Sequence, residues 1–217
     1  MPDAITPEES GPAAGTASAV VRKRPKPGER RVQILQTLAA MLEKPSAERI
    51  TTAALAARLE VSEAALYRHF ASKAQMFEGL IDFIEQSVFS LVNQIVLREA
   101  EAPAGARQVA RVITMLVQFA EKNPGMTRVM VGDALVFENA RLQQRMNQFF
   151  DKIEATFKQS LRDAAVLANA ATPSLQAQVQ AAVLVAFVVG RLQRFVRSDF
   201  KRLPSENLDA SLSLMLG

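Results

Sequence analysis

Apolar residues recur at helical spacing along most of the chain, and this pattern predicts an all-α fold. In the first amphipathic stretch, one helix face is formed by Ile34, Leu35, Leu38, Met41 and Leu42. By the same spacing we expect longer or shorter helices at residues 29–43, 73–98, 106–122, 126–133, 134–168 and 175–202. The residues from 203 onward are weakly patterned, so no element is predicted there.

Residues 49–73 predict a compact arrangement of two short helices, a tight turn and the start of a third helix. Three residues that can cap a helix N-terminus precede these helices: Thr51, Ser62 and Ser72. Gln75 stands three residues after the last of them and completes a capping box. The turn spans residues 60–62 and the second helix 63–69. This spacing is that of a helix-turn-helix, whose second helix enters the major groove of DNA.

The exposed polar side chains of this helix-turn-helix are candidates for contacts with double-stranded DNA. The free N–H groups at the helix starts, and the ammonium group of Lys73, suit a phosphate. Ala64 is small, so the second helix can approach bases closely at its start. The candidate DNA-binding residues are Thr51, Thr52, Ser62, Glu63, Ala64, Tyr67, Arg68, His69 and Lys73.

The positive charge of the chain is concentrated around the same segment. The formal net charge is +4, but residues 22–74 carry eleven bases against five acids, whereas the residues after them carry fifteen bases against fourteen acids. A basic cluster of this kind indicates a polyanionic partner. The other interpretation, that it is a solvated charged surface, stays open on charge alone.

The N-terminal residues 1–28 have the composition of a disordered, Pro-rich acidic tail followed by a basic arm. Residues 1–21 carry three acids and no base, and they are too poor in large apolar residues to offset the cost of ordering. The arm, residues 21–30, is broken by two prolines and a glycine. Two interpretations of the arm stay open: it lies on DNA, or it is a solvated tail.

Composition argues against an enzyme, a metal centre and a membrane protein. The chain has no Cys and one His, so no thiolate site, cysteine nucleophile or histidine cluster can be built. A Ser/His/Asp triad would need His69, and no Gly-rich phosphate loop is present in the sequence. The longest apolar run, residues 181–190, is too short to span a bilayer. We therefore expect no catalytic residue, no metal, no cofactor and no membrane partner.

The segment from Arg49 to Phe77 resembles the DNA-binding domain of the TetR family of bacterial regulators. The most specific piece is LYRHFASK at residues 66–73. The resemblance implies an N-terminal three-helix helix-turn-helix domain and a C-terminal helical dimerisation body. It also implies that Tyr67, His69 and Lys73 contact phosphates. Bases are then expected to be contacted by residues early in the second helix, namely Ser62, Glu63 and Ala64.

Later segments narrow the resemblance to the nucleoid occlusion factors of that family. The most specific pieces are Asn123-Pro124-Gly125 and RFVRS at residues 194–198. The resemblance covers roughly residues 30–204. It implies a homodimer that binds palindromic chromosomal sites, with one or two dimers per site, and that then antagonises the division protein FtsZ so that septa do not close over DNA.

Two phenylalanines of the predicted helix 73–98, Phe83 and Phe89, lie off its apolar stripe. Each either packs against a neighbouring helix or anchors a partner. The resemblance favours a partner contact for Phe83, because it implies that FtsZ docks along the groove between this helix and the next. Lys122 and Asn123 lie beside the same groove, and the alternative is that they are solvent-facing residues at a helix end.

The predicted helix 175–202 contains a stretch, residues 181–190, that is apolar all round and is expected to be buried on every side. Small residues at Ala182, Ala186 and Gly190 allow close helix approach, so we expect them in a four-helix dimer interface. The expected domains are a tail with its arm at residues 1–28, a DNA-binding domain at 29–74 and a helical dimerisation and partner-binding domain at 75–217.

Two functions fit these features. One is a nucleoid occlusion factor that inhibits FtsZ when bound to DNA, in the cytoplasm at the nucleoid. The other is a ligand-responsive TetR-type transcriptional repressor, in which a small molecule enters the C-terminal body. A ligand pocket needs polar groups that converge in an apolar cavity, and the predicted inward positions are almost wholly apolar. This favours the first function.

Overall fold

The computed structural model describes residues 28–44, 50–98 and 105–217, and all regular structure in these ranges is helical. The all-α prediction is therefore confirmed. The predicted tail and nearly all of the basic arm lie outside the described residues. The helices are α1 (Glu29–Leu42), α2 (Thr52–Arg58), α3 (Glu63–Tyr67), α4 (Lys73–Arg98), α5 (Gly105–Lys122), α6 (Pro124–Met130), the 3-10 turn η1 (Asp133–Leu135), α7 (Ala140–Leu167), α8 (Pro173–Arg197) and α9 (Leu208–Leu216).

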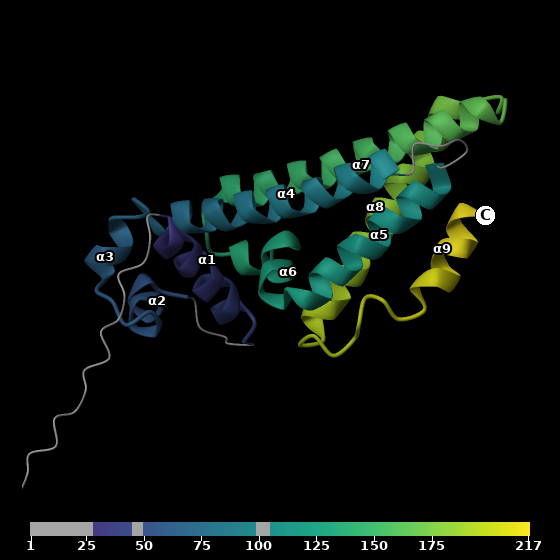
Figure 1. Cartoon of the computed structure of the whole chain (residues 1–217). Coiled ribbons are helices and arrows are strands. Elements are labelled where there is room, and N and C mark those ends of the chain that lie inside the picture. Colours follow the sequence, from purple (N-terminus) through teal and green to yellow (C-terminus); the bar gives the residue numbers. More distant parts are fainter. Residues whose placement is uncertain (1–27, 45–49, 99–104) are drawn as a thin grey trace, which may run out of the picture.

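The three short N-terminal helices gather at one end of an elongated molecule (Figure 1). From there α4 leads away alongside α7, and α7 pairs with α8 in the most extensive helix contact of the fold. Helix α5 packs on α7, α4 and α8, and α6 lies between α5 and α1. This arrangement connects the helix-turn-helix end to the C-terminal body through α4 and α6.

One hydrophobic core runs through both halves of the described chain. Phe70 and Phe77 are fully buried near the helix-turn-helix, and Phe149 and Phe157 are fully buried in the body. Helix α4 supplies residues to both ends, because it continues from Lys73 to Arg98 without a break. The predicted division at residue 74 thus falls inside a helix, and it stays a prediction.

Several helix boundaries differ from the predicted ones. Helices α6 and α8 begin with Pro124 and Pro173, because proline suits the first helical turn, where its missing N–H is not needed. Helix α7 begins six residues later than expected. Gly132 adopts a left-handed conformation with φ 81°, and Asn139 caps α7 by accepting a hydrogen bond from the Arg141 N–H at 3.0 Å.

Helix α9 was not predicted, and α8 ends five residues earlier than expected. After Arg197 the chain turns through Asp199 and Phe200, both at positive φ. Leu208 and Leu212 of α9 are buried, and α9 lies against α5. The element escaped prediction because it is short and apolar on most sides, so that no stripe stands out.

Helix α8 buries one face and leaves the other open. Leu184 and Val188 are fully buried, whereas Val183 is 53% exposed. In the single chain, residues 181–190 are therefore buried on one side only, and burial of the other side stays a prediction for the dimer. The open α8 face comprises Leu175, Val179, Ala182, Val183, Ala186 and the half-buried Gly190. This spacing of three and four residues defines one side of a helix.

By length and composition, α4 and α8 could each cross a bilayer. In this fold each of them packs one face into the core. Ile81 and Ile84 of α4, and Leu184 and Leu192 of α8, have no more than a trace of exposed surface. Helix α4 also carries a row of acids that form ion pairs with α7.

Candidate nucleic-acid interface and partner surface

The three predicted helix caps of the helix-turn-helix end are present. The Thr51 hydroxyl accepts from the Ala54 N–H at 3.1 Å, and the Ser62 hydroxyl accepts from the Ala65 N–H at 3.3 Å. The Ser72 hydroxyl accepts from the Gln75 N–H at 3.2 Å. The Gln75 side chain accepts from the Ala71 N–H at 2.8 Å, so its half of the capping box is shifted by one residue.

A tight turn sets the angle between α2 and α3. Glu60 adopts a left-handed conformation with φ 55°, and the Val61 N–H donates to the Ala56 carbonyl at 3.0 Å. Leu66, on the inner face of α3, is fully buried. Helix α3 ends at Tyr67, two residues before the predicted end, although the His69 N–H still donates to the Leu66 carbonyl at 2.9 Å.

Three of the candidate DNA-binding residues lie together where α2 meets α3. The Thr52 hydroxyl donates to a Glu63 carboxylate oxygen at 2.6 Å, and the Tyr67 hydroxyl donates to Thr52 Oγ1 at 3.5 Å. Tyr67 is 46% exposed, with its phenol at the surface. Because Glu63 accepts from Thr52, its carboxylate helps to fix α2 against α3, and its negative charge does not suit a phosphate.

The remaining candidates of the helix-turn-helix are exposed around α3. Ala64, Arg68 and His69 all have exposed side chains. The backbone after α3 is held from α1: Arg31 Nη1 donates to the His69 carbonyl oxygen at 2.9 Å, and the Arg31 guanidinium lies over the Phe70 ring at 4.1 Å. Sequence reasoning did not identify Arg31 as a positioning residue, since its contact is 38 residues away.

Lys73 already has a carboxylate partner in this structure. Its Nζ lies 2.5 Å from Glu138 Oε1, and 5.6 Å from the centroid of the Phe77 ring. Glu138 belongs to the segment between η1 and α7, 65 residues further along the chain. The sequence offered no sign of this pair, because neither residue has a pattern that points to the other.

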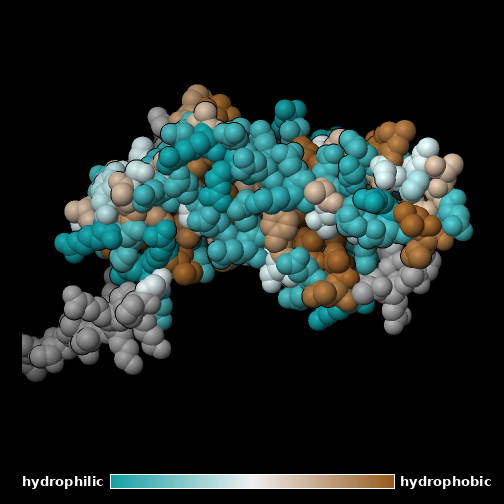
Figure 2. All heavy atoms as spheres, turned by 90° about the horizontal axis from the view of Figure 1, so that it is seen from above, coloured by the Kyte–Doolittle hydropathy of each residue, from teal (hydrophilic) through white to brown (hydrophobic). Residues whose placement is uncertain are grey.

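The Lys73–Glu138 pair is followed along α4 by a row of ion pairs between α4 and α7. Arg141 Nη2 lies 2.5 Å from Glu78, and Arg145 Nη2 lies 2.9 Å from Asp82 and 2.7 Å from Glu85. Burial by itself lowers the pKa of Arg145, but the hydrogen bonds and charges of the two acids outweigh it and raise that pKa. Seen from above, this side of the molecule is mostly hydrophilic, with separate hydrophobic patches (Figure 2).

The two off-stripe phenylalanines of α4 differ in their surroundings. Phe89 packs edge-on against Phe149, with ring centroids 5.5 Å apart, so the packing interpretation holds for Phe89. Phe83 is 41% exposed and remains a candidate partner contact.

The other two partner candidates lie at the end of α5. Lys122 is exposed, and the Asn123 side chain donates to the Phe119 carbonyl at 2.8 Å. Within the described ranges, no hydrogen bond, ion pair or ring contact joins Phe83 to either of them.

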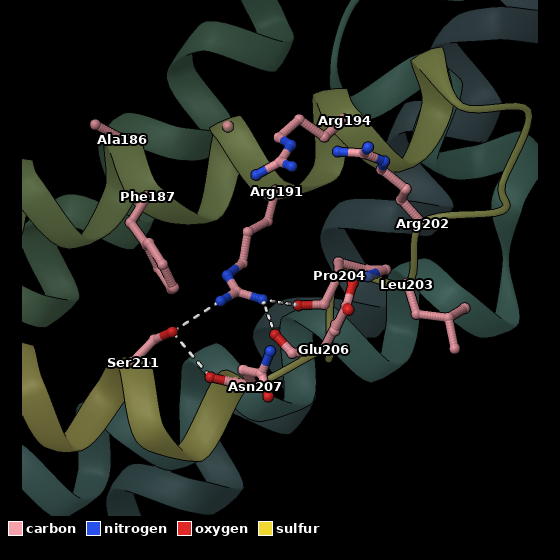
Figure 3. Close-up of a pocket in the computed structure, with 11 residues that line it drawn as sticks. Ala186, Phe187, Arg191, Arg194, Arg202, Leu203, Pro204, Glu206, Asn207 and Ser211 are labelled. Atoms are coloured by element: carbon pink, nitrogen blue, oxygen red, sulfur yellow. Dashed lines mark hydrogen bonds between the residues drawn. The ribbon is translucent and has the colours of Figure 1, made fainter.

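A hollow of about 600 Å³ opens beside the C-terminal half of α8 (Figure 3). Arg191 reaches across it and donates to the carbonyls of Pro204 and Glu206, at 2.8 and 2.7 Å, and to the Ser211 hydroxyl at 2.9 Å. Burial lowers the pKa of Arg191, the charge of Arg194 lowers it further, and Glu206 offsets part of the effect.

These hydrogen bonds hold the segment before α9, and the first turn of α9, against α8. Ala186 and Gly190 of the open α8 face also line the hollow. The predicted dimer residues Ala182, Ala186 and Gly190 therefore lie on an apolar surface that is accessible in the single chain, with the hollow beside it.

Two family models match the chain. The model of the bacterial regulatory proteins of the tetR family matches residues 34–80, which include α2, α3 and the start of α4. A model of the tetracyclin repressor-like C-terminal domain, of the SlmA-like type, matches residues 105–217. Together they cover both ends of the described fold.

Proteins named nucleoid occlusion factor SlmA are similar to the chain over most of its length. The protein of Aliivibrio fischeri strain ES114 is 50% identical over 192 residues, which is 88% of this chain and 96% of that protein. The protein of Vibrio cholerae is 49% identical over 187 residues, covering 86% and 93%. That of Colwellia psychrerythraea is 46% identical over 198 residues, covering 91% and 98%.

Solved structures of TetR-type regulators share the fold at low sequence identity. The regulator FadR of Bacillus subtilis in complex with stearoyl-CoA aligns with a TM-score of 0.69 at 13% identity, over 86% of this chain and 97% of that one. A TetR-family regulator of Bordetella parapertussis aligns with a TM-score of 0.64 at 14% identity, over 87% and 95%. At this identity the likeness concerns the fold alone.

Proposed function

Because the chain belongs to the TetR family and, within it, to the SlmA nucleoid occlusion factors, we propose that it inhibits FtsZ assembly when bound to palindromic chromosomal sites. It is a nucleoid occlusion factor that binds DNA as a dimer. Its relatives are regulators and not enzymes. We place it in the cytoplasm at the nucleoid, without a membrane partner.

The feature that carries the DNA-binding proposal is the exposed polar cluster of the helix-turn-helix. Thr51 and Thr52 lie at the N-terminus of α2, where unpaired N–H groups suit a phosphate. Tyr67, Arg68 and His69 present further donors from α3 and the turn after it. Phosphate contacts of this kind fix the protein on the duplex without reading its sequence.

Base recognition is proposed for the start of α3. Ala64 is exposed and small, and Ser62 retains its hydroxyl hydrogen for a base after capping the helix. Glu63 is committed to Thr52, so we assign it to orienting α3. Since a two-fold dimer carries two copies of α3, its sites should have palindromic half-sites about one helical turn apart, roughly 34 Å, or a multiple of that distance.

The partner surface is proposed around Phe83. An aromatic ring that stays 41% exposed beside a row of charged residues suits a partner anchor. The ring lies on α4, which begins at the DNA-binding end, so one rigid helix joins the two surfaces. Lys122 and Asn123 are proposed as secondary contacts at the end of α5. Docking of FtsZ across the residue 75–217 body would then leave the helix-turn-helix free for DNA.

The experiment is an FtsZ polymerisation assay followed by light scattering and pelleting in the presence of GTP. The protein is added alone, with a genomic duplex that it retains in a pull-down, and with a scrambled duplex of equal length. Loss of polymer only with the retained duplex supports the proposal. Full inhibition without DNA, or no inhibition with it, contradicts the proposal.

Phe83→Ala tests the partner surface in the same assay. We expect the variant to keep its DNA affinity and to lose FtsZ inhibition, because an exposed anchor contributes to the interface and not to the core. Leu91→Ala is the matched control, since Leu91 lies on the same helix and is 39% exposed. It should behave as the unmodified protein. If Phe83→Ala lost both activities, the side chain would belong to the core; if it lost neither, the surface would lie elsewhere.

A further inference from the structure

We propose that Glu138 sets the DNA affinity of this protein by competing with DNA phosphate for the ammonium group of Lys73. The inference rests on the proposed phosphate contact of Lys73. In this proposal Glu138, a residue of the C-terminal body, acts on the phosphate contact by positioning Lys73. DNA binding then opens an ion pair between the two halves of the chain.

The geometry of the pair makes the competition strong. Lys73 Nζ lies 2.5 Å from Glu138 Oε1, and the two side chains are 20% and 8% exposed. Salt and water therefore screen this pair less than an exposed one. The Phe77 ring, 5.6 Å from the same nitrogen, adds a favourable surface for the cation. Lys73 thus has a well-defined place in the absence of DNA.

The Glu138 carboxylate is presented from an ordered turn. The Glu138 N–H donates to the Leu135 carbonyl at 3.0 Å, which closes the turn after η1. The next residue, Asn139, caps α7. Together with the Lys73 ion pair, these contacts define the turn in the absence of DNA, and the Glu138 side chain reaches the start of α4 from the body of the protein.

A phosphate cannot use Lys73 without a cost at Glu138. If the ammonium moves to the phosphate, a nearly buried carboxylate loses a cation that lies 2.5 Å away. If the ammonium bridges both groups, two negative charges come within about 5 Å of each other and repel. Both arrangements weaken DNA binding, so removal of the Glu138 charge should strengthen it.

The same cost predicts a response in the segment that carries Glu138. Loss of the Lys73 contact favours movement of the turn between η1 and α7 toward solvent. Val136 lies in this turn and is 68% exposed, so burial of its side chain does little to oppose the movement. DNA binding at α3 thereby changes the conformation of the turn at the N-terminus of α7.

A double-mutant cycle tests the competition. DNA affinity is measured by fluorescence anisotropy, over a salt series, for the unmodified protein, Lys73→Gln, Glu138→Gln and the double variant. We expect Glu138→Gln to bind about fivefold more tightly and Lys73→Gln to bind more weakly with a salt slope reduced by about one. The double variant should match Lys73→Gln, because Glu138 acts through Lys73. Glu138→Asp keeps the charge and should stay near the unmodified affinity.

Glu78→Gln is the matched control, since it removes an acid from α4 that pairs with Arg141 and leaves Lys73 untouched. Its affinity should stay within about twofold of the unmodified protein. If Glu78→Gln binds DNA as tightly as Glu138→Gln, a general charge effect explains the gain and the proposal is wrong. The same conclusion holds if Glu138→Gln raises DNA affinity equally in the Lys73→Gln background. If Lys73→Gln alone changes neither affinity nor slope, the Lys73 phosphate contact itself is wrong.

Hydrogen exchange in the unmodified protein gives a readout that does not depend on any variant. Amide exchange across residues 133–140 should rise when the retained duplex is added, because the turn loses its contact with Lys73. Glu138→Gln should show the raised exchange before DNA is added. Unchanged or slower exchange in this segment on DNA binding would overturn the coupling.

Discussion

Gly125 fixes how closely α6 approaches α1. A Cβ atom at this position would lie 2.0 Å from the Ala39 carbonyl oxygen and 2.9 Å from its carbon. Both are backbone atoms of a helix, so they cannot turn away as a side chain does. The contact between α1 and α6 is a second connection, in addition to α4, between the DNA-binding end and the body. It requires a residue without a side chain at position 125.

We predict that Gly125→Ala lowers the free energy of unfolding by about 3 kcal/mol, because α6 must move away from α1. Urea denaturation followed by circular dichroism measures the change. Gly79→Ala is the control. There the added methyl would lie 3.1 Å from a Phe70 ring carbon and 3.3 Å from a Leu35 methyl, and side chains can shift. Its stability should stay within about 1 kcal/mol of the unmodified protein, and an equal loss in both variants would refute the argument.

At the scale of single residues, local roles were predictable and distant ones were not. Thr51, Ser62 and Ser72 were identified as caps because a cap depends on the next three residues. Glu138 and Arg31 could not be found, since their partners lie 65 and 38 residues away. The ion pair of Lys73 could not be predicted for the same reason. Its neighbours in sequence suggested an ammonium group without a protein partner, because Glu138 is 65 residues away.

Among the elements, α4 is the one whose surroundings matter most for function. It begins in the DNA-binding end, buries a stripe in the core and turns its acids toward α7. Arg145 is the centre of the α4–α7 row of ion pairs, because it contacts both Asp82 and Glu85. The contribution of these partly exposed ion pairs to stability depends on salt, because dissolved ions screen the charges.

We predict that Arg145→Gln lowers the free energy of unfolding by about 1 kcal/mol at low salt, and that the difference shrinks in 0.5 M NaCl. Arg141→Gln is the control, because Arg141 is more exposed and contacts Glu78 alone among the ion pairs of α4 and α7 given above. Its effect should be smaller. Urea denaturation at the two salt concentrations gives both values. A loss that is independent of salt would show that packing, and not charge, stabilises the contact between α4 and α7.

The sequence was enough to predict that the long helices exist. Where a helix begins or ends depends on contacts with distant residues, which the sequence does not display. The long amphipathic helices were predicted because their apolar stripes span many turns. The start of α7 was misplaced because Asn139 and the left-handed Gly132 interrupt an apolar pattern that continues across them. Helix α9 depends on its contact with α5, which no pattern within its nine residues reveals.

At the scale of the whole molecule, the open α8 face is what remains unburied when one chain folds alone. Leu175, Val179 and Val183 are each more than half exposed and lie on one side of the helix. Apolar surface of this extent is typical of an interface. We propose that two chains pair through it, with α7 and α8 of each chain forming a four-helix arrangement. The small residues Ala182, Ala186 and Gly190 would let the helices approach.

We predict that Gly190→Leu raises the dimer dissociation constant at least tenfold without unfolding the protomer. In the single chain an added Cβ at this position meets nothing within 4 Å, so a side chain here starts in open space. Against a second copy of α8 the leucine would hold the helices apart. Sedimentation equilibrium measures the dissociation constant, and circular dichroism checks the fold.

Ser90→Leu adds the same side chain at an exposed position of α4 and should leave the dimer intact. DNA affinity gives a second readout of the pairing, because a monomer occupies one half-site and loses the gain from simultaneous binding. Gly190→Leu should therefore weaken DNA binding in proportion to the monomer fraction and recover it at high protein concentration. A variant that remains dimeric with an unchanged constant would mean that the chains pair through another face. The open α8 face would then need a different partner to cover it.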